Sequence, residues 1–138
     1  MNRFAAIVTV VPILAIAAIL IMTVPEKWRL IHILGLVLLL PGLVLLTMAR
    51  VQLGSAFSIS AQANTLVTRG LYSRIRNPIY VFGIPVITGL ILYLNRPLYL
   101  LILIPLILLQ IIRARRESQV LEEQFGEAYR QFKSRTWF

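Results

Sequence analysis

The sequence predicts an all-α protein, a polytopic membrane helix bundle with about four apolar runs and a C-terminal amphipathic helix. Two observations carry this prediction. Of the 138 residues 59% are hydrophobic and only 14% are charged, whereas about a quarter of the residues in a soluble domain are charged. The apolar residues also gather in long uncharged stretches, and a helix needs about 20 such residues to cross a bilayer. The length fits one membrane domain over residues 1–138.

The first two apolar runs are residues 4–24 and 30–49. The first is uncharged throughout and exceeds the apolar region of a signal peptide, which is about 7–15 residues long. We therefore expect it to be a spanning helix. The short turn after it contains Trp28, a residue type that favours the membrane interface. Arg50 is expected to end the second run.

The next segment, residues 51–77, is too polar to lie in lipid and is expected at a membrane face. Asn77-Pro78 then opens a third run, residues 79–94, because proline suits the first turn of a helix. The fourth run is residues 98–112. Each of these two runs is near 24 Å long as a helix, about 16 residues, so they form a spanning or partly re-entrant hairpin.

Residues 113–133 form the charged tail. Leu121, Phe125, Ala128 and Phe132 recur at helical spacing, which predicts an amphipathic helix lying on the membrane. Gly126 is a potential break in it.

The basic residues predict the orientation. Four runs place the N-terminus, residues 51–77 and the tail on one side of the membrane. That side holds Arg3, Arg50, Arg69, Arg74, Arg76, Arg113, Arg115, Arg116, Arg130, Lys133 and Arg135, and the other holds Lys27, Arg29 and Arg96. Cytoplasmic loops are rich in Lys and Arg, so both termini are predicted to be cytoplasmic.

Several classes of site are disfavoured by composition. The chain has no cysteine, no aspartate and one histidine, His32, so no metal site is expected. The net charge of +9 favours anionic membrane lipids as partners over nucleic acid in so apolar a chain. There is no glycine-rich phosphate loop.

Arg113 and Glu117 are the main candidates for chemistry. They are four residues apart on one helix face, where the fourth run leaves the membrane. An inward ionisable pair at that depth is a functional hypothesis, and an ordinary helix salt bridge worth about 0.3–0.5 kcal/mol is the alternative. Tyr72 and Tyr80 are either interface anchors or walls of a site. The spacing alone leaves both questions open.

Two stretches resemble the isoprenylcysteine carboxyl methyltransferase and phospholipid methyltransferase family of integral membrane enzymes. Residues 64–72 read Asn-Thr-Leu-Val-Thr-Arg-Gly-Leu-Tyr, and Arg-Asn-Pro-Ile-Tyr follows at 76–80. The tail resembles the family's C-terminal signature through Arg113, Glu117, Leu121 and Phe125-Gly126. The likeness departs from the family at Ser118, where a second glutamate is usual.

The resemblance implies that these segments bind S-adenosylmethionine. Its cofactor-binding residues would be Asn64, Thr65, Leu66, Val67, Tyr72, Asn77, Pro78, Ile79, Tyr80 and Glu117. Arg113 would hold the substrate, which makes Arg113 and Glu117 the catalytic candidates. Backbone amides near Pro78 would be placed to meet the cofactor carboxylate.

The leading functional hypothesis is therefore an S-adenosylmethionine-dependent methyltransferase that acts on a lipophilic acceptor, such as an isoprenoid, a prenyl carboxylate or a phospholipid-like molecule. The alternative is a non-enzymatic membrane scaffold or lipid-binding protein. A weaker third hypothesis is a reductase, which would bind NADPH. The catalytic hypothesis requires that the segment before residue 79 and the helix after residue 112 meet in space.

Overall fold

The computed structural model describes residues 3–54 and 66–138. The five α-helices in this part of the chain are α1 (Arg3–Met22), α2 (Leu30–Leu53), α3 (Pro78–Tyr93), α4 (Leu103–Phe125) and α5 (Glu127–Ser134). Two 3-10 turns, η2 (Gly70–Ser73) and η3 (Pro97–Ile102), precede α3 and α4. No strand occurs within these residues, which confirms the predicted all-α class.

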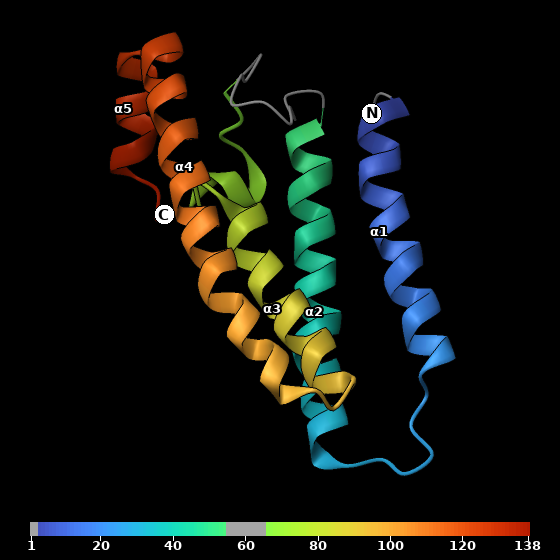
Figure 1. The fold of residues 1–138 in the computed structure, drawn as a ribbon. Coiled ribbons are helices and arrows are strands. Elements are labelled where there is room, and N and C mark those ends of the chain that lie inside the picture. The colour runs from blue at the N-terminus through green and yellow to red at the C-terminus, as the bar shows by residue number, and fades with distance from the viewer. Residues whose placement is uncertain (1–2, 55–65) are drawn as a thin grey trace.

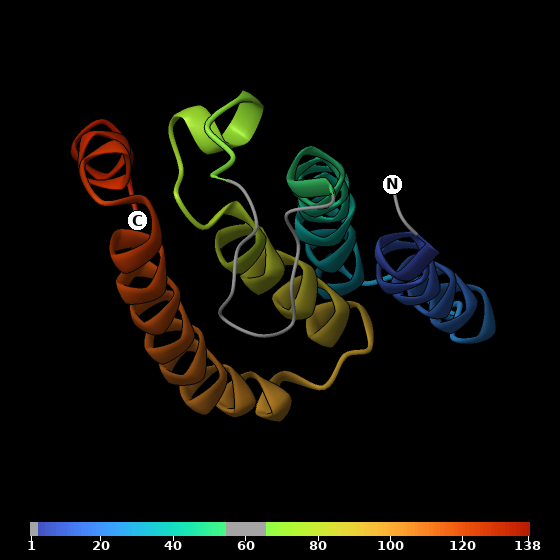
Figure 2. The same cartoon turned by 90° about the horizontal axis from the view of Figure 1, so that it is seen from above.

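The helices α1 to α4 run alternately up and down, so the start of α1 lies at the same end as the close of α4 (Figure 1). Residues 66–77 lie at this end too. Seen from above, those residues lie between α2 on one side and α4 with α5 on the other (Figure 2). The topology thus brings residues 66–77 and the charged half of α4 to the same end of the bundle.

Among the described residues, three helical segments contain an apolar part long enough to cross a membrane: Arg3–Met22, Leu30–Leu53 and Pro97–Phe125. The apolar helix α3 is shorter, at 16 residues. It begins with Pro78 in its first turn, as expected, because proline there gives up no helical hydrogen bond.

Two helix ends differ from the expected ones. Arg50 does not end α2, which continues to Leu53 and closes with Gly54 at a φ of 53°. The charged tail is not one helix from residue 113, because α4 runs without a break from its apolar half to Phe125. Gly126, at a φ of 55°, then separates α4 from α5.

The closest helix contact is between α2 and α3, where the two backbones touch at glycines. A Cβ atom added to Gly35 would overlap the Tyr93 nitrogen, and one added to Gly89 would lie 2.5 Å from the Leu39 nitrogen. Small residues allow such close approach between membrane helices, and dispersion attraction between the two surfaces then stabilises the pair. This contact fixes α3, and with it Tyr80, against α2.

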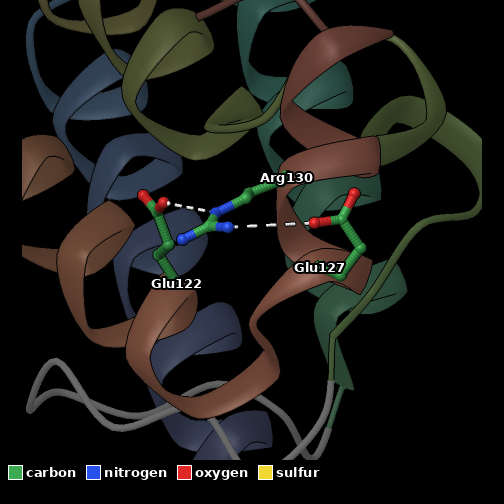
Figure 3. A network of polar contacts seen from close by, with 3 residues as sticks. All are labelled: Glu122, Glu127 and Arg130. Carbon is green, nitrogen blue, oxygen red and sulfur yellow. Dashed lines mark hydrogen bonds and ion pairs between the residues drawn. The ribbon is translucent and has the colours of Figure 1, made fainter.

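The short helix α5 folds back against α4. Tyr129 is 1% exposed, and its hydroxyl donates a hydrogen bond to Ser118 Oγ at 2.8 Å. On the outside of the corner, Arg130 pairs with Glu122 at 3.0 Å and with Glu127 at 3.8 Å (Figure 3). These two ion pairs are exposed, so the buried Tyr129 contributes more to docking than they do.

The glycine contact predicts opposite outcomes for two glycine-to-alanine changes. Gly35→Ala should lower the stability by about 1–3 kcal/mol, because the methyl group would overlap the α3 backbone. Gly83→Ala is the control: its Cβ would meet only Gln110 Nε2, at 3.7 Å, so it should be neutral or stabilising. Thermal unfolding in one detergent measures both. Equal unfolding temperatures for the two variants would refute the close α2–α3 contact.

Candidate functional site

A hydrogen bond joins the two segments singled out in the sequence. The Tyr80 hydroxyl, in the first turn of α3, donates to Glu117 Oε1 of α4 at 2.5 Å. Glu117 is half-buried. The residues are 37 positions apart in the sequence, and they meet because α3 and α4 are antiparallel. The spatial condition that the catalytic hypothesis requires is therefore met.

Tyr72 belongs to the same cluster. It is 6% exposed and lies in η2. Burial raises the pKa of its phenol, and the negative charge of Glu117 raises it further, while Arg50 opposes the shift. Tyr72 is therefore neutral at physiological pH and keeps its proton as a hydrogen-bond donor.

Two arginines complete the cluster. Arg50, in the last turn of α2, lies within electrostatic range of both Tyr72 and Tyr80. Arg113 also lies within electrostatic range of Tyr80. Arg113 is exposed. Arg113 and Glu117 form no ion pair in the described structure, so Glu117 is held by Tyr80 and not by its helical neighbour. We call Arg50, Tyr72, Tyr80, Arg113 and Glu117 the tyrosine–glutamate cluster.

Gln52 holds the turn that carries Tyr72. Its Oε1 accepts a hydrogen bond from the Leu71 amide at 2.7 Å. Gly70 has a φ of 60°, and a Cβ there would overlap the same oxygen. Only glycine allows both this backbone conformation and this close approach. The link fixes η2 to the end of α2.

The last two residues hold the segment before α3. Trp137 donates its amide to the Arg74 carbonyl at 2.6 Å, and its own carbonyl accepts the Arg76 amide at 2.9 Å. The Phe138 carbonyl accepts both the backbone amide and the side-chain Nδ2 of Asn77, each at 2.9 Å. This pairing ties residues 74–77 to the end of α5.

The same hydrogen bonds contradict part of the expectation that backbone amides near Pro78 meet the cofactor carboxylate. The amides of Arg76 and Asn77 are not free to meet a ligand carboxylate, because the Trp137 and Phe138 carbonyls accept them. The amides of Tyr80 and Val81 are also bound, to the Asn77 carbonyl. The expected role of backbone amides around Pro78 is wrong for these four groups.

The other predicted site residues are placed as follows. Asn64 and Thr65 lie outside the described residues. Leu66, Val67 and Ile79 are half-buried, and Pro78 is fully buried. Because these last four side chains are apolar, they could offer a ligand van der Waals contact but no hydrogen bond.

Sequence reasoning missed three contributors: Arg50, Gln52 and the Trp137–Phe138 pair. From the sequence, Arg50 is expected only as a helix end and as part of the basic side, although an arginine in the last turn of an apolar helix is also a candidate for a site at that membrane face. No sequence signal pointed to Gln52 or to the terminal pair, because both act through backbone groups distant in sequence.

A hollow lies at the opposite end of the bundle from the cluster. Its volume is about 360 Å³, and its lining comprises Thr23, Pro25, His32, Tyr93, Leu94, Arg96 and Tyr99. His32 is buried there, and its Nδ1 accepts the Arg29 amide at 2.9 Å. His32 therefore caps α2 and takes no part in the cluster.

The cluster combines one carboxylate, two phenol groups and two guanidinium groups. The carboxylate suits a cationic or hydroxyl-bearing group of a ligand, and the guanidinium groups suit a carboxylate or phosphate. Such a set fits a ligand that carries both signs of charge.

Comparison with known families gives a match over residues 30–128 to the family described as phospholipid methyltransferase. The matched range includes α2, α3, α4 and the whole tyrosine–glutamate cluster. Comparisons with curated proteins and with solved structures give no match. Because the match covers well over half of the chain and includes every member of the cluster, the chain belongs to the phospholipid methyltransferase family.

Proposed function

We propose that this protein is a membrane-embedded methyltransferase that takes its methyl group from S-adenosylmethionine and transfers it to a lipophilic acceptor. The hydrogen bond between Tyr80 and Glu117 is the observation that supports this most. It joins the two segments that would bind the cofactor, and it holds a carboxylate at the end of an otherwise apolar helix hairpin.

The chemistry of the residues fits this cofactor. S-adenosylmethionine carries an ammonium, a carboxylate, a ribose and a sulfonium cation. Glu117 suits the ammonium or the ribose hydroxyls. Arg76 suits the carboxylate, because its Nε is buried without a hydrogen-bond partner among the described residues. A buried donor of this kind favours a ligand that completes its hydrogen bonding.

When bound, the cofactor supplies an electrophilic methyl group on sulfur. The residues would contribute binding and orientation, since methyl transfer depends on in-line approach of the acceptor. Tyr80 fixes the Glu117 carboxylate, and the neutral Tyr72 offers a donor beside it. Arg113 is exposed where α4 leaves its apolar half, so it would hold the acceptor near the cofactor as a hydrogen-bond donor to an oxygen of its polar end.

The remaining predicted residues have supporting roles in this proposal. Asn64, Thr65, Leu66, Val67 and Ile79 would surround the cofactor, with Pro78 starting the helix that presents Tyr80. Asn77 would act indirectly, because its side chain is bound to Phe138.

We also propose that the cluster faces the cytoplasm, with both termini on that side. Eleven of the 14 Lys and Arg residues are assigned to that side by the alternation of the runs, and such an excess is typical of cytoplasmic faces. A water-soluble cofactor would then enter from the cytoplasm, while the acceptor would enter from the membrane.

Neutralising Glu117 tests the proposed function. Wild-type protein in detergent should bind S-adenosylhomocysteine in calorimetry. Glu117→Gln should weaken that binding about 10- to 100-fold, because a hydrogen bond to a charged group is lost. Glu123→Gln is the matched control, since Glu123 is an exposed glutamate of the same helix.

No binding by folded wild-type protein, or equal affinity in the Glu117 and Glu123 variants, would contradict the proposal. Either result would favour the non-enzymatic alternative, a scaffold or lipid-binding protein, in which Glu117 has no ligand to hold.

The orientation can be tested with single cysteines, because the chain has none of its own. Lys27→Cys and Lys133→Cys place the same change in exposed positions at opposite ends of the bundle. In intact cells a membrane-impermeant maleimide should label the variant at residue 27 alone. Labelling at residue 133 before the membrane is opened would reverse the proposed orientation.

A further inference from the structure

Gln110 is an unusual residue in the apolar half of α4. The ten residues from Leu103 to Ile112 are apolar apart from this glutamine. Its Oε1 is buried and has no hydrogen-bond partner in the part of the chain that the structure describes. Buried polar atoms are almost always hydrogen-bonded, so an exception calls for an explanation. Polar side chains at membrane depth commonly mark substrate pathways.

The position of Gln110 relates it to the tyrosine–glutamate cluster. Gly83 of α3 faces it, since a Cβ on Gly83 would lie 3.7 Å from Gln110 Nε2. Gly83 is one helical turn after Tyr80, and Gln110 is about two turns before Glu117. Because the two helices are antiparallel, the Gly83–Gln110 contact lies deeper in the apolar hairpin than the Tyr80–Glu117 bond.

Two small residues lie near Gln110. Gly83 has no side chain, and Ala114, one turn after Gln110 on α4, is buried. A glutamine that served only to join two membrane helices would bond across the interface, and the oxygen of Gln110 forms no such bond to any described residue. The open hydrogen-bonding capacity therefore points to a ligand between the cluster and the apolar part of the hairpin.

We infer that Gln110 binds the polar end of the methyl acceptor beside Gly83, and that this end is a neutral hydroxyl on a lipophilic body, an aliphatic or aromatic alcohol. This inference rests on the proposed function. The atom that lacks a partner is a carbonyl oxygen, which accepts a hydrogen bond and cannot donate one. A hydroxyl donates to it and keeps its own lone pairs. In the transfer one of these pairs would form the new O–CH3 bond as the S–CH3 bond of S-adenosylmethionine breaks, S-adenosylhomocysteine would leave with the electrons of that bond, and the hydroxyl proton would pass to water at the cluster end of the hairpin.

Two other acceptor classes fit this position less well. A carboxylate has only lone pairs at neutral pH, so it could accept from Gln110 Nε2 but would leave the buried Oε1 without a donor. A lipophilic amine is protonated at neutral pH, and a charged group among apolar side chains is costly to desolvate. No described acidic side chain lies on the α4 stretch Leu103–Ile112 to offset that charge.

The test compares Gln110→Met with Gln119→Met, a matched change of an exposed glutamine on the same helix. Both variants and the wild type are reconstituted in lipid nanodiscs. The probes are dodecanol, dodecylamine and laurate, with methyl transfer from S-adenosylmethionine as one readout and binding of the probe by thermal shift as another. Binding of S-adenosylhomocysteine is measured in parallel.

Dodecanol should be the preferred probe of the wild type. Gln110→Met should raise its KM about five- to tenfold with little change in kcat, which matches the loss of one hydrogen bond. It should weaken the thermal shift by dodecanol in parallel. Gln119→Met should behave as the wild type, and S-adenosylhomocysteine affinity should be the same in all three proteins.

Three results would overturn the inference: preference for laurate, preference for dodecylamine, or an unchanged KM and thermal shift for dodecanol in Gln110→Met. These failures differ from failure of the proposed function, which would show as absent S-adenosylhomocysteine binding in the wild type.

Discussion

The hydrogen bond from Tyr80 to Glu117 is the constraint on which the candidate site depends. It places a carboxylate from the exit of α4 beside the first turn of α3, at one end of an apolar bundle. A carboxylate in this setting needs a partner that satisfies it without removing its charge. A phenol does this, whereas the nearby Arg113 forms no ion pair with it among the described residues and stays exposed. Glu117 therefore remains available to a ligand.

The rest of the fold serves to hold that bond in place. Glycines at the α2–α3 contact set the position of α3. Gln52 fixes the turn that carries Tyr72 to the end of α2. The pairing of Trp137 and Phe138 with residues 74–77 ties the entry of α3 to the end of α5. Because α5 is itself docked on Ser118 through Tyr129, α3 and α4 are linked on both sides of the cluster. The Ser118 hydroxyl thus has a structural use, as the acceptor for Tyr129.

The apolar helices and the start of α3 could be predicted from the sequence. The uncharged runs predicted the helices because length and hydrophobicity decide membrane insertion, and Pro78 marked the start of α3 for a local steric reason. The four-residue spacing of Arg113 and Glu117 predicted an inward pair, whereas in the structure Glu117 is half-buried and Arg113 is exposed. The spacing could not show that Glu117 bonds to Tyr80 and not to Arg113, because that choice depends on how α3 and α4 are placed relative to each other.

Other features escaped prediction for related reasons. The end of α2 was placed too early, since an arginine at the close of an apolar run does not by itself stop a helix. Hydrogen bonds with backbone groups are the contribution of Gln52, Trp137 and Phe138. Every residue type has such backbone groups, so the sequence pattern does not reveal these bonds. The oxygen of Gln110, which has no partner among the described residues, likewise emerges only once its surroundings are known.

The most direct test of this account is a double-mutant cycle on S-adenosylhomocysteine affinity with Tyr80→Phe, Glu117→Ala and the combined variant. If the phenol acts by fixing the carboxylate, Tyr80→Phe will weaken binding in the presence of Glu117 and have little effect once Glu117 is removed, with a coupling free energy of about 0.5–3 kcal/mol. Strictly additive effects of the two substitutions would contradict the account, because they would mean that Tyr80 and Glu117 do not act on the ligand as one unit.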